Sequence, residues 1–144
     1  MKIVICGSID ATYEIKKIAD ELETMGHKTE IPLTSQRILN GELTLDEFKK
    51  EKEANGDGFV RKVKDDVIRR YYELIRNSDA VLVANYPKKG IKDYIGGNTF
   101  LEMGFAHVLE KKIYLLNPIP EIGYKDEILA MEPVVLGGDL GGIQ

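Results

Sequence analysis

Short apolar runs alternate with longer segments in which apolar residues recur every three or four positions. Runs of this kind are typical of strands that are buried on both faces of a parallel sheet. The pattern predicts strands at 2–6, 28–31, 80–84, 112–116 and 134–136. The periodic segments predict helices at 12–25, 60–77 and 98–110.

Strands that alternate with helices predict a parallel sheet covered by helices on both faces. We therefore expect one α/β domain spanning residues 1–144, doubly wound in the flavodoxin-like or Rossmann-like manner, with about five parallel strands in the order 2-1-3-4-5. Right-handed crossovers bring the loops that follow parallel strands to one edge of the sheet, where ligands bind in such folds. The loops at 7–8, 85–97 and 117 are predicted to meet there.

The stretch 34–58 departs from this alternation. A charged helix is predicted at 44–54, because Thr44 and Glu47 have the spacing of a capping box. The Asn-Gly-Asp-Gly run at 55–58 is predicted to end it. We interpret the stretch as a helical excursion from the sheet, and both a lid over a ligand and a solvated connector remain open.

Composition narrows the classes of partner. The net charge is -4 and both signs are mixed along the chain, which argues against a nucleic-acid-binding face. No apolar stretch approaches the roughly 20 residues of a membrane span, and Met1 leads into a strand rather than a signal peptide, so we expect a cytoplasmic protein with no membrane partner. Cys6 is the only cysteine, and neither an HxxxH motif nor a carboxylate cluster predicts a metal.

A glycine pair precedes the predicted helix at 98–110. Gly96 and Gly97 can adopt positive φ, so that their N–H groups can turn toward one point, and Asn98 or Thr99 can cap the helix. Such a corner suits a phosphate or a sugar. Glu102 lies about one turn inside the helix, near the same mouth.

Glu102 has two interpretations. Its carboxylate either attacks or supports C1 of a sugar, as in retaining glycoside chemistry, or it is a favourable negative charge near a helix start. In the second interpretation Leu101, Phe105 and Val108 face the sheet.

The other predicted loops supply further candidates. The segment after the first strand has a glycine for close backbone approach and a hydroxyl beside it, and with the glycine pair it resembles a clamp on a sugar phosphate. It fits neither GxGxxG nor GxxxxGK[ST], so the usual dinucleotide and nucleoside-triphosphate sites lose support. The substrate-binding candidates in these loops are Gly7, Ser8, Ile9, Asp10, Asn85 and Asn117.

Tyrosines and lysines near these loops are ambiguous. Tyr71 and Tyr72 are neighbours in the middle of a predicted helix, so at most one of them can point into the protein core. The other could reach the edge of the site or a partner subunit. Lys88, Lys89 and Lys92 flank the ligand loop and either attract an anionic substrate or form a solvated turn.

Four segments together resemble the nucleoside 2-deoxyribosyltransferase superfamily, including its deoxynucleoside-monophosphate N-glycosidases. They are Cys-Gly-Ser-Ile at 6–9, the strand at 79–84, the strand at 111–116 and, most specifically, Gly-Gly-Asn-Thr-Phe-Leu-Glu-Met-Gly-Phe-Ala at 96–106. The resemblance covers nearly the whole chain. It implies a small-molecule nucleoside or nucleotide substrate, no cofactor, and a homodimer or higher homo-oligomer.

The resemblance also implies roles for single residues. Glu102 corresponds to the family nucleophile, which forms a covalent glycosyl intermediate, while Ser8 and the loop 96–98 hold sugar and phosphate. Tyr71 stands where family hydrolases commonly have an acidic residue that assists the departing base, and Asp10 stands where the nucleotide hydrolases often have a basic one.

The sequence therefore predicts N-glycosidic bond cleavage or transfer on a nucleoside or nucleoside monophosphate, with Glu102 and Tyr71 as catalytic residues. A non-catalytic module that senses nucleotides through the same pocket is the alternative. Phosphoribohydrolase chemistry of the cytokinin-activating kind ranks last, because the proline before the glycines and the basic partner of that family are missing.

Overall fold

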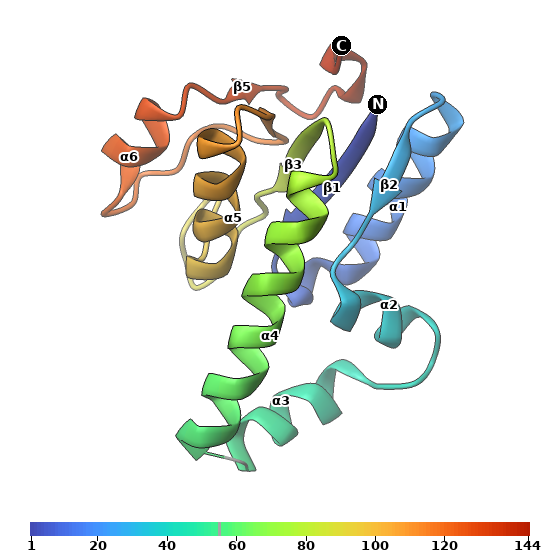
Figure 1. The fold of residues 1–144 in the computed structure, drawn as a ribbon, viewed down its shortest axis with the longest axis vertical. Helices are drawn as coiled ribbons and strands as arrows, with labels where there is room; N and C mark the ends of the chain where they lie inside the picture. The colour runs from blue at the N-terminus through green and yellow to red at the C-terminus, as the bar shows by residue number, and fades with distance from the viewer. Residues whose placement is uncertain (55) are drawn as a thin grey trace.

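Five parallel strands form one sheet in the order β2-β1-β3-β4-β5. The computed structural model describes residues 1–54 and 56–144, and of residues 59 and 60 only the backbone. The strands are β1 (Lys2–Gly7), β2 (Lys28–Glu30), β3 (Ala80–Ala84), β4 (Lys112–Leu115) and β5 (Val134–Val135). The predicted fold class and strand order are confirmed, and Figure 1 shows the strands with their flanking helices.

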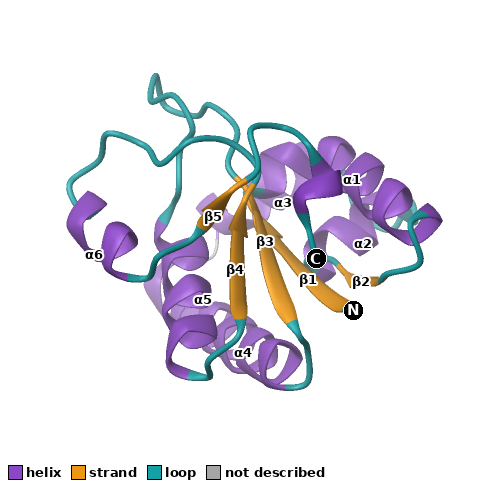
Figure 2. Cartoon of the chain, turned by 90° about the horizontal axis from the view of Figure 1, so that it is seen from above, coloured by secondary structure: helices purple, strands orange, loops and turns teal. Residues whose placement is uncertain are grey.

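Helices cover both faces of this sheet. Figure 2 shows α1 (Thr12–Thr24) on one side and α4 (Gly56–Arg76) and α5 (Gly97–Val108) on the other. Successive side chains of β1 point to opposite faces of the sheet: Ile3 and Ile5 pack with α1, while Val4 and Cys6 pack with α4 and α5. Cys6 is fully buried, as expected of a small apolar side chain.

The register of the central strands aligns the loops that follow them. Gly7 at the end of β1 is paired with Ala84 at the end of β3, and Val83 is paired with Leu115 of β4. The loops that follow β3 and β4 contact each other at this edge of the sheet, since the amide N–H of Asn117 donates to Asn85 Oδ1 at 2.9 Å. This confirms that the loops after β1, β3 and β4 lie together.

Several helix predictions need correction. The excursion contains α2 (Leu33–Leu39) as well as α3 (Leu45–Ala54), and α6 (Lys125–Ala130) precedes β5; α2 and α6 were not predicted. Helix α3 ends at Ala54, as the glycine-rich run predicted, but α4 begins at Gly56, four residues before its predicted start, so Gly56 and Gly58 belong to α4. Asn55, the first residue of that run, lies outside the described residues.

Both helices of the excursion contact the body of the domain, α2 through Ser35 and α3 through the ion pair of Lys49 with Asp10. The hydroxyls of Thr12 and Ser35 are 2.9 Å apart and buried, which ties α2 to the start of α1. The predicted cap of α3 is confirmed, because the amide of Glu47 donates to Thr44 Oγ1 at 3.0 Å. Figure 1 shows α3 beside the N-terminal part of α4, beyond the end of the sheet. No helix in the described part of the chain is both long and apolar enough to span a bilayer.

Candidate active site

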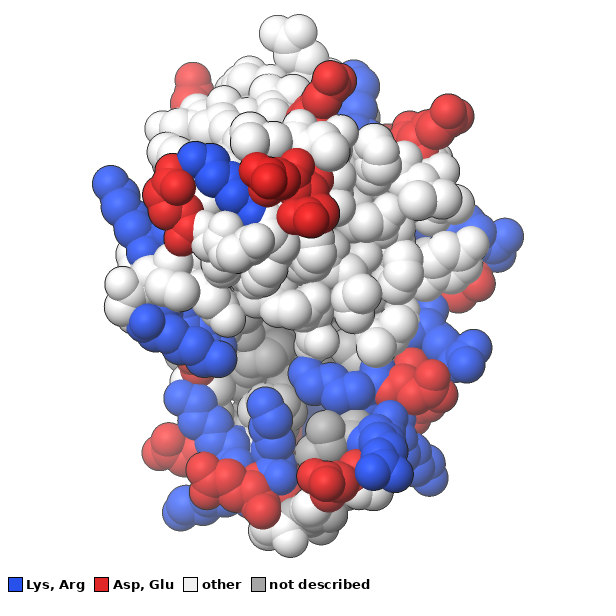
Figure 3. All heavy atoms as spheres, turned by 90° about the vertical axis from the view of Figure 1, so that its left-hand side faces the viewer, with Lys and Arg blue, Asp and Glu red and all other residues white. Residues whose placement is uncertain are grey.

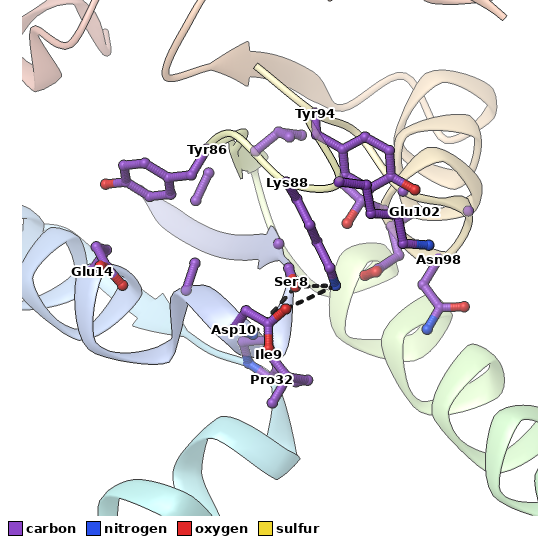
Figure 4. Close-up of a pocket in the computed structure, with 18 of the residues that line it drawn as sticks. Ser8, Ile9, Asp10, Glu14, Pro32, Tyr86, Lys88, Tyr94, Asn98 and Glu102 are labelled. Atoms are coloured by element: carbon purple, nitrogen blue, oxygen red, sulfur yellow. Dashed lines mark hydrogen bonds and ion pairs between the residues drawn. The ribbon is translucent and has the colours of Figure 1, made fainter. Parts of the chain in front are cut away.

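A cavity of about 700 Å³ opens at the edge of the sheet where the loops meet. Its walls are the loop after β1, the loop and helix start after β3, and the facing sides of α3 and α4. Figure 4 shows side chains from several of these elements turned into it. The volume lies in the range of small-molecule sites.

The first wall is formed by the predicted residues of the β1 loop, Gly7, Ser8, Ile9 and Asp10. Close packing against β3 favours a glycine at position 7, because an added Cβ would lie 3.2 Å from the carbonyl oxygen of Ala84. The Ser8 hydroxyl accepts from the amide of Asp10 at 3.2 Å and caps the short 3₁₀ turn η1 (Ile9–Ala11). The hydroxyl is thereby held at the rim of the cavity.

A tight turn after β3 places a lysine over this wall. Lys88 and Ile91 exchange two backbone hydrogen bonds across Lys89 (φ 53°) and Gly90 (φ 73°), the dihedral pattern of a type I′ turn. From this turn Lys88 Nζ donates to Ser8 Oγ at 2.8 Å and lies 3.2 Å from Asp10 Oδ2. Lys49 of α3 reaches the other oxygen of Asp10 at 3.1 Å. Partial burial by itself would raise the pKa of Asp10, but the ammonium groups of Lys49 and Lys88 together lower it below its ordinary value.

The start of α5 forms the opposite wall, with a geometry that differs from the prediction. Gly96 is extended (φ −82°, ψ 175°) and precedes the helix, Gly97 is its first residue, and neither has positive φ. Asn98 and Thr99 lie inside the helix and do not cap it. Since no side chain caps the helix and Gly96 O first accepts from Phe100 N, the amides of residues 97–99 are available to a ligand.

Glu102 lies on the face of α5 that packs against the sheet. Thr99, Glu102, Met103 and Ala106 form the buried stripe. The alternative in which Leu101 and Val108 face the sheet is wrong, because these side chains are 45% and 80% exposed. A carboxyl group therefore occupies a position where the helical pattern would otherwise place an apolar residue.

Burial changes the chemistry of this carboxyl group. Glu102 is 8% exposed, and its Oε2 has no hydrogen-bond partner among the described residues. Burial raises the pKa of Glu102 to about 8, against the weaker lowering effects of the Cys6 thiol and the Lys64 ammonium group. The same surroundings raise the pKa of Cys6, chiefly through burial and secondarily through Glu102. A buried acid that lines a cavity with one oxygen unpaired lowers stability and is typical of a functional group.

Tyr71 is the buried member of its pair and lines the same cavity. Its hydroxyl donates to the carbonyl oxygen of Ile5 at 3.3 Å. Burial, with smaller contributions from Cys6 and Glu102, raises the pKa of Tyr71 well above its ordinary value. Tyr72 is more exposed and packs edge-on against Phe105, with ring centroids 5.5 Å apart.

The lysines of α3 and α4 were not predicted as site residues from the sequence. Lys49, Lys52 and Lys64 line the cavity together with Lys88. A signal for α3 was present, because residues 45, 48, 49 and 52 have the i, i+3, i+4, i+7 spacing of one helical face, and all four line the cavity. Figure 3 shows Lys and Arg side chains over the lower part of this face of the molecule, interspersed with Asp and Glu side chains.

Asn85 and Asn117 do not line the cavity. Instead, Asn85 Nδ2 donates to the carbonyl oxygens of Asn117 and Pro118 at 3.0 Å each, and Asn117 Nδ2 donates back to Asn85 O at 3.1 Å. The pair joins the loops after β3 and β4 behind the site.

No protein-family model matches the chain, and comparisons with curated proteins and with solved structures gave no match. No cluster of three or more His, Cys, Asp or Glu side chains suited to a metal occurs within residues 1–54 and 56–144. The function is therefore argued from the geometry: a buried acid, free helix amides and a positively charged wall surround one cavity.

Proposed function

We propose that the protein cleaves or transfers the N-glycosidic bond of a nucleoside or nucleoside monophosphate, with Glu102 as the nucleophile. The observation that carries the proposal is the buried, unpaired Glu102 Oε2 in a cavity shared with Ser8 and the first amides of α5. A sugar held by those amides would present its anomeric carbon to the acid. The resemblance of residues 96–106 to the nucleoside 2-deoxyribosyltransferase superfamily points to the same chemistry.

The proposed reaction proceeds in two steps with overall retention at C1′. An ionised Glu102 oxygen bonds to C1′ while the C1′–N bond breaks, and the base departs with the bonding electrons and takes up a proton. Water then attacks C1′, loses a proton and releases the glutamate; in the transfer reaction a second base attacks instead. Water is the better proton source for the departing base, because the Tyr71 hydroxyl is bonded to Ile5 O and its pKa is raised.

The raised pKa sets the working pH range of this mechanism. With a pKa of about 8, only about a tenth of Glu102 is ionised at pH 7 in the empty site. Lys64 favours the ionised form. The fraction of Glu102 that is ionised, and thus able to attack, therefore increases as the pH approaches 8. Because the carboxylate is buried, few water molecules must be displaced from it before it attacks.

The direct test is release of free base from a panel of nucleosides and their 5′-monophosphates, followed by chromatography. Glu102→Ala is expected to lower the rate by at least about 10³-fold, since it removes the group that bonds to C1′. Glu14→Gln is the matched control, because Glu14 is an exposed carboxyl group at the rim of the same cavity. Release that survives Glu102→Ala unchanged would eliminate the mechanism.

One observation favours a second candidate, a nucleotide-sensing module. A carboxyl group with a pKa of about 8 is mainly protonated at neutral pH and can donate a hydrogen bond to a ribose hydroxyl. Calorimetry separates the two candidates: tight binding of an intact nucleotide, with no product over hours, supports the sensor. The homo-oligomer and the cytoplasmic location stay predictions under either candidate.

A further inference from the structure

Four lysines from three separate elements converge on one part of the cavity. Lys49 and Lys52 come from α3, Lys64 from α4 and Lys88 from the turn after β3. We call these four residues the lysine cluster. Its members affect one another. Burial lowers the pKa of Lys64 most, and the positive charges of Lys52 and Lys88 lower it further. Like charges that interact in this way are destabilising unless an anion lies among them.

The described residues compensate only part of this charge. Asp10 pairs with Lys49 and Lys88, at 3.1 Å and 3.2 Å. Lys52 and Lys64 make no hydrogen bond or ion pair with any residue that the structure describes. Glu102 compensates little, because its carboxyl group, with a pKa of about 8, is mainly protonated at neutral pH. The cluster therefore has room for an anion with more than one charge.

Asp10 marks where that anion would lie. Its two carboxylate oxygens bridge Lys49 and Lys88, beside the Ser8 hydroxyl that also accepts from Lys88. A tetrahedral phosphate has oxygens suited to the same donors and carries a charge of about −1.5 to −2 at neutral pH. Figure 4 shows Ser8, Asp10 and Lys88 on one side of the cavity and Asn98 and Glu102 on the other. A nucleotide whose sugar lies at Glu102 would extend its 5′-phosphate toward the lysines.

We propose that the lysine cluster binds the 5′-phosphate of the substrate, and that Asp10 holds Lys49 and Lys88 in place while the site is empty. This inference rests on the proposed function and makes it more specific: the substrate is a nucleotide rather than a nucleoside. Asp10 competes with the phosphate for the same ammonium groups. Helix α3 is then part of the binding site rather than a solvated connector.

The test is calorimetry of the full chain with the four common deoxynucleosides and, separately, their 5′-monophosphates. The best monophosphate is expected to bind at least about tenfold more tightly than its nucleoside, since two or more charge-assisted contacts are added. The double variant Lys49→Gln/Lys88→Gln should remove most of this difference and leave the nucleoside affinity within about twofold. Asp10→Asn should tighten monophosphate binding by about threefold to tenfold, because the internal competitor is gone.

Lys92→Gln is the matched control, because Lys92 is an exposed lysine of the same loop that does not line the cavity. It is expected to leave both affinities unchanged. If the double variant unfolds, Lys52→Gln tests the cluster alone, since Lys52 is exposed on α3 and has no partner among the described residues. A loss of about threefold or more in monophosphate affinity is expected there.

Two results overturn the inference: equal affinity for nucleoside and monophosphate, or weaker monophosphate binding in Asp10→Asn. The outcome is separable from that of the proposed chemistry, because binding is measured without turnover. Phosphate-dependent binding with no base release supports the lysine cluster and rejects the glycosidase, whereas base release from nucleosides with no preference for phosphate does the reverse.

Discussion

The side chain of Glu102 shows how one residue departs from the pattern of its helix. It stands in the stripe of α5 that also contains Met103 and Ala106, so packing of the helix on the sheet necessarily buries it. Burial favours the neutral acid, and the pKa rises to about 8 from an ordinary value of 4.5. The fold thus holds a costly group at the cavity wall, as sites that need reactive acids do.

The cost has a defined pH dependence. Because the pKa of Glu102 is raised in the folded protein, the unfolded chain loses this proton near pH 4.5 while the folded chain keeps it up to about pH 8. Its contribution to the free energy of unfolding is therefore fully present below pH 4.5 and is lost progressively as the pH rises to about 8. Glutamine at this position does not titrate. Between pH 5 and pH 8 the free energy of unfolding of Glu102→Gln should therefore rise by a few kcal/mol relative to that of the wild type.

Urea unfolding at half-unit steps from pH 5 to pH 9 measures this difference. Glu14→Gln, at an exposed position on the cavity rim, should follow the wild-type curve. A constant difference between Glu102→Gln and the wild type across the range would contradict the assignment of a buried neutral acid.

At the scale of elements, the site depends on how closely β1 and the start of α5 approach their neighbours. Gly7 ends β1 against β3, and an added Cβ there would lie 3.2 Å from both Ala84 O and Ile15 Cδ1. Gly97 begins α5, where an added Cβ would meet no atom within 4 Å. Both glycines line the cavity, but for different reasons: one allows packing and the other leaves open space in front of the helix amides.

This contrast gives a matched pair of substitutions. Gly7→Ala is expected to lower the free energy of unfolding by about 1–2 kcal/mol, because backbone and a buried side chain must shift. Gly97→Ala should be neutral or raise it by about 0.5 kcal/mol, since its φ is not positive and alanine favours the helix. Equal effects in denaturant unfolding would show that the close approach at Gly7 is not a constraint.

At the scale of the whole molecule, the buried amide of Asn85 joins loops that come from different strands. Asn85 is 1% exposed, donates to Asn117 O and Pro118 O, and accepts from Asn117 N. Its amide thereby connects the loops after β3 and β4, since Asn85 and Asn117 are 32 residues apart in the chain. The candidate site lies in front of this junction, so the loop that carries Lys88 and leads to Glu102 depends on it.

Asn85→Ala should therefore destabilise the protein by about 2–4 kcal/mol, because it leaves buried backbone groups without partners. Asn98→Ala, at a partly exposed position on the cavity wall, is the control and should change stability by less than about 0.5 kcal/mol. Thermal unfolding followed by circular dichroism measures both. A change of less than 1 kcal/mol for Asn85→Ala would mean that the junction is not needed for folding.

Local patterns were sufficient to predict the sheet and most of the loop residues that line the candidate site. Apolar runs and turn residues gave the strand order, and Gly7, Ser8, Gly96, Gly97 and Glu102 all line one cavity. The details of the glycine pair were not predictable in this way: the chain enters α5 in an extended conformation, and the positive φ values occur earlier, at Lys89, Gly90 and Asp93. A glycine permits several conformations, and only its neighbours select one.

The amino-acid sequence by itself determined the α/β class, the parallel order of the strands and the edge of the sheet at which the loops meet, because these follow from hydrophobic period and crossover handedness. Only the tertiary structure decided that Glu102 is buried with one carboxyl oxygen unpaired, that Asn85 and Asn117 join loops behind the cavity, and that lysines from α3 and α4 line the same cavity as Ser8 and Asp10. Those features depend on which surfaces of distant elements meet, and charge and burial at such a contact are properties of the packed chain rather than of any segment in it.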